Sequence, residues 1–124
     1  MSSCAEDLIV SPVGLYGKFW RLRQEFIVEV DGERDIVPQD FLTDFASTQV
    51  PRLLLPGASA YHDWLYWEQK YSRLRCDQLF MKYMITKRVN FIIRWAFYLG
   101  CRLFGWAAWW RNKWLKGRGV RRPE

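Results

Sequence analysis

Histidine and cysteine, the residues that most often bind transition metals in proteins, are scarce in this sequence. One histidine, His62, and three cysteines, Cys4, Cys76 and Cys101, occur among 124 residues. A single histidine excludes sites that need two, such as those of His-Asp phosphohydrolases and zinc peptidases. The cysteines are widely spaced and form no Cys-x-x-Cys pair, so neither a zinc clamp nor a cycling disulfide is predicted.

Other absences bear on where the protein works. The N-terminus lacks a basic stretch followed by an apolar one, so no cleaved export signal is predicted, and the odd cysteines fit a reducing cytoplasm. The segment 89–115 is rich in Trp, Phe and Leu, but Arg94 and Arg102 leave only seven uncharged residues between them. A transmembrane span needs about 18 apolar residues, so none is predicted. The glycines Gly14 and Gly17 also lack the context of a phosphate-binding P-loop.

Chain length and charge set the domain organisation. Half of the residues are hydrophobic, enough for one core in 124 residues, and we predict one domain over 1–116 with a basic flexible tail at 117–124.

Charge is distributed unevenly along the chain. Residues 1–80 hold 8 Lys and Arg against 12 Asp and Glu, a charge of −4, while 81–124 hold 11 against 1, a charge of +10. The basic end is either a solvated face or a contact surface for nucleic acid, a membrane or an acidic protein.

Alternating apolar and charged residues predict strands in the first third of the chain. Segments 19–23 and 25–30 are rich in aromatic and β-branched residues, and Asp31-Gly32 is typical of a tight hairpin turn before a short strand at 34–37. Between Pro38 and Pro56 this periodicity is lost, which predicts an ordered polar loop. We expect a short antiparallel sheet.

Three helices are predicted after this loop. The first covers 61–67 with Ser59 as its cap, the second runs roughly from Leu74 to Lys87, and the third from Val89 to Leu115. The third helix suits either core packing, which we favour, or a position in a membrane interface. The fold class is therefore α+β, a short antiparallel sheet packed against about three α-helices.

One group of polar residues has the composition of an acid–base site. His62 and Asp63 are expected in the first turn of a helix, with Tyr66 one turn beyond His62 on the same face. Asp44 on the loop and Asp77 on the next helix could hydrogen-bond the imidazole, as acid–base catalysis requires. The alternatives are a buried network that joins loop to helices, and a site for one divalent metal ion.

Nucleophiles and aromatic contacts extend this group. Ser47 and Cys76 are within folding reach of His62, but neither lies in a recognisable hydrolase motif. Trp64 and Trp67 either pack in the core or stack on a ligand.

Four blocks of the sequence resemble a known family. They are Phe41-Leu42-Thr43-Asp44-Phe45-Ala46-Ser47, Val50-Pro51-Arg52, His62-Asp63-Trp64-Leu65-Tyr66, and Asp77 with Phe80, followed by Arg102-Leu103-Phe104-Gly105-Trp106 near the end. The set is similar to the phage and prophage family catalogued as domain of unknown function 1353 (DUF1353). The resemblance covers roughly residues 15–110 and implies a phage or prophage origin with no known activity.

The resemblance and the residues together define three hypotheses. In the first, Asp44, His62, Asp63, Asp77 and Tyr66 form a hydrolase-like acid–base or metal site that acts on host material in the host cytoplasm. In the second, the same cleft binds a host protein, nucleotide or cell-envelope ligand without catalysis, through Thr43, Ser47, Arg52, Trp64 and Trp67. In the third, a lysis or virion accessory protein docks through its aromatic basic C-terminus, peripherally at the inner membrane.

Overall fold

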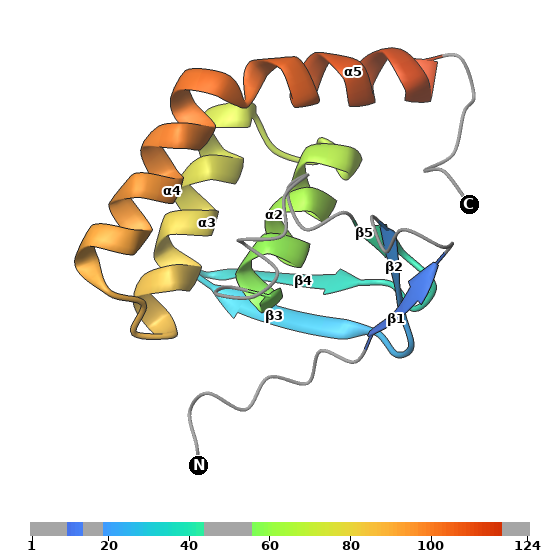
Figure 1. The fold of residues 1–124 in the computed structure, drawn as a ribbon, viewed down its shortest axis with the longest axis horizontal. Coiled ribbons are helices and arrows are strands. Elements are labelled where there is room, and N and C mark those ends of the chain that lie inside the picture. The colour runs from blue at the N-terminus through green and yellow to red at the C-terminus, as the bar shows by residue number, and fades with distance from the viewer. Residues whose placement is uncertain (1–9, 14–18, 44–55, 118–124) are drawn as a thin grey trace.

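Two small antiparallel sheets and four helices make up the protein, so the predicted α+β class is confirmed (Figure 1). The computed structural model describes residues 10–13, 19–43 and 56–117. The predicted tail at 117–124 lies almost wholly outside these ranges, and the division into a domain and a tail stays a prediction.

The predicted hairpin is present. Strand β3 (Phe26–Val30) pairs with β4 (Glu33–Val37), and the side chains of β3 alternate between buried and exposed. The turn residues Asp31 and Gly32 have φ values of 51° and 79°, as the tight two-residue turn requires. One face of the hairpin therefore belongs to the core.

A second sheet, which the sequence did not predict as separate, has the strand order β1-β2-β5. It contains β1 (Val10–Val13), β2 (Phe19–Leu22) and β5 (Leu42–Thr43). The sequence predicted the hairpin sheet and missed this second one, because β5 has only two residues and β1 contains Pro12. Proline weakens a strand signal, and it is tolerated here at the sheet edge.

Helix α2 (Pro56–Glu68) is the central element, with buried side chains from Ala58 to Trp67. It begins three residues before Ser59, so the expectation that Ser59 caps it was wrong. Pro56 occupies the first helical position, where its missing N–H costs nothing. His62 is consequently the seventh residue of α2, and the expected place of His62 and Asp63 in the first turn was also wrong.

Helix α3 (Arg73–Thr86) agrees with the prediction, with Ser72 as its N-cap. The prediction of a single third helix was wrong, because two helices occupy this segment. Helix α4 (Phe91–Phe104) is capped by Asn90 and ends at Gly105, and α5 (Trp106–Gly117) follows in a new direction (Figure 1). None of the helices in the described ranges is long and apolar enough to cross a membrane.

The core lies between the β3-β4 hairpin and helices α2 and α3, with parts of α4 and α5 packed on it. Trp64 and Trp67 are buried members of this core. The buried carboxylate of Asp35 on β4 joins the hairpin to the helices, because it accepts hydrogen bonds from Tyr61, Tyr71 and Lys70 at 3.0–3.2 Å.

Helix α5 packs against α2, as expected for a C-terminal helix that belongs to the domain. Gln69 Nε2 donates to the carbonyl oxygen of Trp109 at 2.8 Å, and Lys116 Nζ donates to that of Glu68 at 2.9 Å. These two hydrogen bonds connect the C-terminal end of α2 to both the first and the last turn of α5.

Candidate functional site

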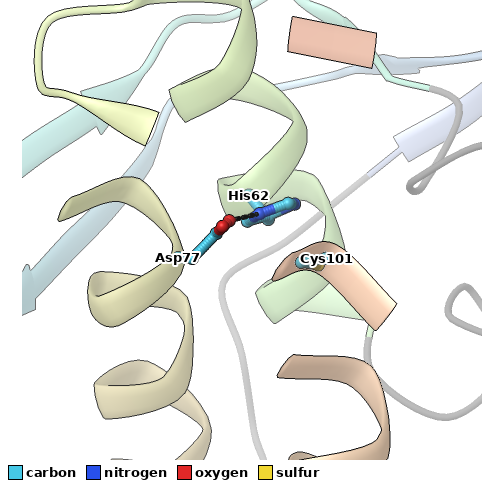
Figure 2. A group of neighbouring side chains, drawn as sticks. All are labelled: His62, Asp77 and Cys101. Atoms are coloured by element: carbon cyan, nitrogen blue, oxygen red, sulfur yellow. Dashed lines mark hydrogen bonds and ion pairs between the residues drawn. The ribbon is translucent and has the colours of Figure 1, made fainter. Parts of the chain in front are cut away.

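Helices α2 and α3 bring the only histidine of the chain against a buried carboxylate. His62 Nε2 lies 2.8 Å from Asp77 Oδ1, and the two residues are 5% and 0% exposed (Figure 2). A carboxylate can only accept, so Nε2 is protonated and Nδ1 is the nitrogen left for other chemistry.

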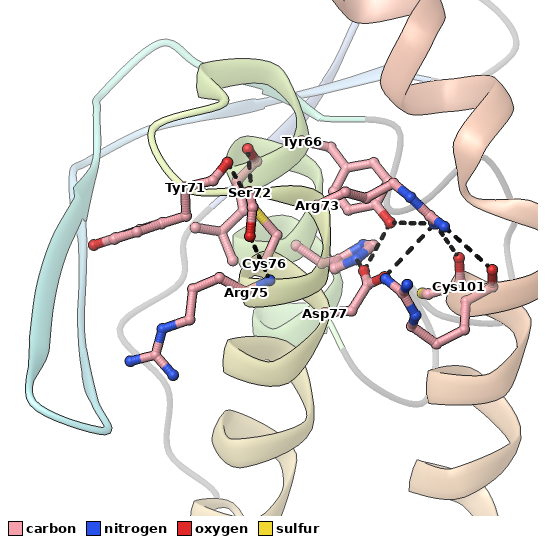
Figure 3. A network of polar contacts seen from close by, with 11 residues as sticks. Tyr66, Tyr71, Ser72, Arg73, Arg75, Cys76, Asp77 and Cys101 are labelled. Carbon is pink, nitrogen blue, oxygen red and sulfur yellow. Dashed lines mark hydrogen bonds and ion pairs between the residues drawn. The ribbon is translucent and has the colours of Figure 1, made fainter.

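Asp77 has a donor on each of its oxygens. Tyr66 Oη donates to Oδ1 at 2.7 Å, Arg102 Nη1 donates to Oδ2 at 2.8 Å, and Arg73 Nη1 lies 3.7 Å from Oδ2 (Figure 3). Burial alone would raise the pKa of Asp77, but the bonds from His62, Tyr66 and Arg102 hold that pKa below its usual value. Asp77 is therefore an ionised carboxylate inside the protein.

Cys101 of α4 completes the group. Its Sγ, a ring nitrogen of His62 and a carboxylate oxygen of Asp77 all lie within 4.8 Å of one another. The imidazole is held between two rings, with centroids 4.3 Å from Tyr66 and 4.5 Å from Phe80. Cys101 is partly exposed, which makes it the member of the group that an outside molecule can reach.

The charge state of His62 is set by these neighbours. Burial disfavours a charged imidazole, but the electrostatic interaction with Cys101 and the hydrogen bond to Asp77 outweigh it and raise the pKa of His62 to about 10. Burial and the Asp77 carboxylate raise the pKa of Tyr66, which stays a neutral donor. At neutral pH the imidazole is therefore an imidazolium beside the ionised Asp77 carboxylate.

Arg73 fixes the end of α4 beside the site. Its Nη1 donates to the carbonyl oxygen of Cys101 at 2.9 Å and its Nη2 to that of Arg102 at 3.3 Å (Figure 3). Cys101 lies in the last turn of α4, where the helix dipole disfavours an anion, and the guanidinium offsets that effect. Gly105 permits this packing, because a Cβ there would lie 2.7 Å from Tyr66 Oη.

The other predicted residues lie in different places. Neighbouring residues of a helix point about 100° apart, so Asp63 faces away from the side of α2 on which His62 meets Asp77. Asp63 Oδ2 instead accepts a hydrogen bond from Thr43 Oγ1 at 2.8 Å, in a buried pair. Asp44, Ser47 and Arg52 lie outside the described residues. His62, Tyr66 and Asp77 are thus the predicted residues that the fold brings together.

Of the two nucleophile candidates from the sequence, Ser47 lies outside the described residues, and Cys76 is not the cysteine grouped with His62 and Asp77, which is Cys101. Cys76 is fully buried, and burial raises its pKa to about 12, which makes it a poor nucleophile. Cys101, Arg73 and Arg102 were not chosen from the sequence. A signal existed for the arginines: Arg73 precedes Asp77 by four residues, and Arg102 interrupts an otherwise apolar helix.

The group fits a metal ion poorly. His62, Asp77 and Cys101 offer ligand types suited to a divalent ion. Both oxygens of Asp77 already accept hydrogen bonds, however, and two guanidinium groups lie on its Oδ2. A cation would have to compete with the imidazolium of His62 and the guanidinium groups of Arg73 and Arg102 for the Asp77 carboxylate.

These features define a small α+β protein with a buried His–Asp pair and a partly exposed thiol. The sequence model of the family described as "Protein of unknown function (DUF1353)" matches residues 20–101, and the chain belongs to that family. His62, Asp77 and Cys101 all fall within the match. No curated protein and no solved structure matches the chain.

Proposed function

We propose that the protein is a hydrolase in which Cys101 is the nucleophile and His62, oriented by Asp77, is the general acid and base. One observation carries the proposal: a partly exposed thiol, an imidazole and an ionised carboxylate lie within 4.8 Å, with the imidazole protonated at neutral pH. Nucleophile, base and orienting acid in series are the usual arrangement of cysteine hydrolases.

The reaction proceeds in two steps. The Cys101 thiolate attacks a carbonyl carbon, the C–O or C–N bond to the leaving group breaks, and the leaving group takes the proton of His62. Neutral His62 then removes a proton from water, the hydroxide attacks the thioester carbon, and the C–S bond breaks. The products are a carboxylic acid and the original thiolate–imidazolium pair, so protons and electrons balance.

The biological setting follows from the family resemblance. A phage or prophage origin, as that resemblance implies, supports a substrate in host material, with an ester or amide bond. In the alternative function, the same residues bind a host ligand without catalysis and form no thioester. Formation of a thioester on Cys101 therefore distinguishes the hydrolase from the binding protein.

Iodoacetamide labelling followed by mass spectrometry tests the nucleophile. At pH 7 we expect Cys101 to react much faster than buried Cys76, which serves as an internal control. His62→Gln should slow Cys101 labelling by about tenfold or more, because a thiol reacts faster beside a positively charged imidazolium and the substitution removes it. Thr43→Val, which removes the buried bond to Asp63, is the matched control and should leave the rate unchanged.

Reaction with p-nitrophenyl acetate tests catalysis itself. The wild type should release a burst of about one nitrophenolate per chain as the thioester forms. Cys101→Ala should abolish the burst and Cys76→Ala should keep it. A burst that survives Cys101→Ala, or Cys101 labelling that is indifferent to His62→Gln, contradicts the proposal.

A further inference from the structure

The outer face of α4 is apolar and exposed to solvent. The side chains concerned are 41–74% exposed: Phe91, Ile92, Trp95, Leu99 and Leu103. Four of these are spaced by four residues and so lie along one face of the helix. The inner face of the same helix is used by the core, and core packing therefore leaves the outer face unexplained.

Helix α5 carries a second exposed apolar row, made of tryptophan. Trp106, Trp110 and Trp114 are 57–61% exposed and again spaced by four. We call these three side chains and the five on α4 the aromatic stripe. Figure 1 shows α4 and α5 following each other along the outer border of the molecule. An exposed apolar surface of this kind marks an interaction site.

The charged residues on the two helices that carry the aromatic stripe have one sign. Residues 78–117 contain eight Lys and Arg and no acidic residue. Two of the cations lie on the stripe itself, with Lys113 Nζ 5.0 Å from the centroid of the Trp110 ring and the Arg94 guanidinium 5.2 Å from that of Phe91. The partner must therefore offer both an apolar layer and negative charge.

We propose that the aromatic stripe docks the protein peripherally on an anionic membrane surface. Tryptophan side chains favour the interface between lipid headgroups and acyl chains, and Lys and Arg beside them are attracted by anionic headgroups. A second copy of the chain is a poor occupant, because stripe-to-stripe pairing would bring two basic surfaces together. The inference does not depend on the chemistry proposed for Cys101.

Co-sedimentation of the full chain with lipid vesicles tests the docking. Vesicles of phosphatidylcholine with about a third phosphatidylglycerol should bind the protein in 50 mM NaCl. Binding should weaken by about tenfold or more in 500 mM NaCl and with pure phosphatidylcholine, since screening and loss of anionic lipid remove the same attraction.

Surface variants distinguish membrane binding through the aromatic stripe from nonspecific hydrophobic binding. Leu99→Ser with Trp110→Ser should reduce binding by at least about tenfold, since each removes an inserted apolar group. Ile27→Ser with Ile36→Ser is the matched control: these two residues are paired, 44% and 38% exposed, and lie on the hairpin. The control should bind like the wild type, and circular dichroism should show both variants folded.

Reversal of charge gives a second comparison. Arg111→Glu with Lys113→Glu should weaken binding to anionic vesicles strongly, while Arg23→Glu with Arg34→Glu should weaken it little. Absence of binding to anionic vesicles in 50 mM NaCl overturns the proposal. So does a dimer, seen by sedimentation equilibrium, that Leu99→Ser with Trp110→Ser dissociates, or tight binding of a DNA oligonucleotide or an acidic polypeptide without any binding of vesicles.

Discussion

Asp77 is the residue on which the site depends. Its side chain is fully buried and accepts hydrogen bonds from His62, Tyr66 and Arg102, and it forms a further ion pair with Arg73. Removal of one partner from a buried ionic group leaves the other charges without compensation, which is costly even where the intact group contributes little net stability.

Asp77→Asn is therefore expected to destabilise the fold by about 3–5 kcal/mol, the range for a broken buried pair. Urea unfolding followed by circular dichroism measures the change. Asp31→Asn is the control, because Asp31 pairs with Arg75 on the exposed hairpin turn and its loss should matter little. Equal losses of stability in the two variants would show that the charges around Asp77 do not need its carboxylate as a buried partner.

At the scale of elements, Gly105 decides where α4 ends and α5 begins. Its amide donates to the carbonyl oxygen of Cys101 at 2.9 Å, and its missing side chain leaves room for Tyr66 and Arg73. The chain turns there, so that α4 packs on α3 while α5 packs on α2.

Gly105→Ala should accordingly destabilise the protein by about 1–3 kcal/mol, as overpacking does. Gly100→Ala on α4 is the matched substitution, since a Cβ there meets nothing within 4 Å. It should be neutral or stabilising by about 0.5–1 kcal/mol, because alanine is the better helix former. Thermal melts of both variants check this, and a stabilising Gly105→Ala would mean that the junction is not tightly packed.

The elements also show how far the sequence could predict the structure. The hairpin turn at Asp31-Gly32 and helix α3 follow from local signals and were found. The break at Gly105 was missed because a glycine inside an apolar run does not by itself end a helix, and here tertiary packing decides it. Cys101 was missed for the same reason: its approach to His62 depends on how α4 packs, which no local spacing in the sequence reports.

At the scale of the whole molecule, the site makes stability depend on pH. The folded pKa of His62, about 10, lies above its ordinary value of 6.5. The stabilisation from the imidazolium is therefore fully present below about pH 6.5 and is lost as pH rises towards 10. For Asp77, with a lowered pKa, the contribution is present above its ordinary value of 3.8 and is lost at lower pH.

Urea unfolding at pH 6, 7 and 8, below the range in which Cys76 and the buried tyrosines ionise on unfolding, should show a falling free energy of unfolding in the wild type. In His62→Gln the fall should be much shallower, since His62 is the only histidine of the chain. Parallel curves for the two proteins would place the pH dependence in other groups.

The pairing of Cys101 with His62 is tested most directly by titration of the single histidine, followed by nuclear magnetic resonance. Because only His62 contributes an imidazole signal, its pKa can be followed without assignment of other residues. The account predicts a pKa of about 10 in the wild type. It also predicts a clear decrease in Cys101→Ser, which keeps the shape but removes the thiolate. A pKa at or below 6.5 in the wild type, or the same pKa in both proteins, would contradict it.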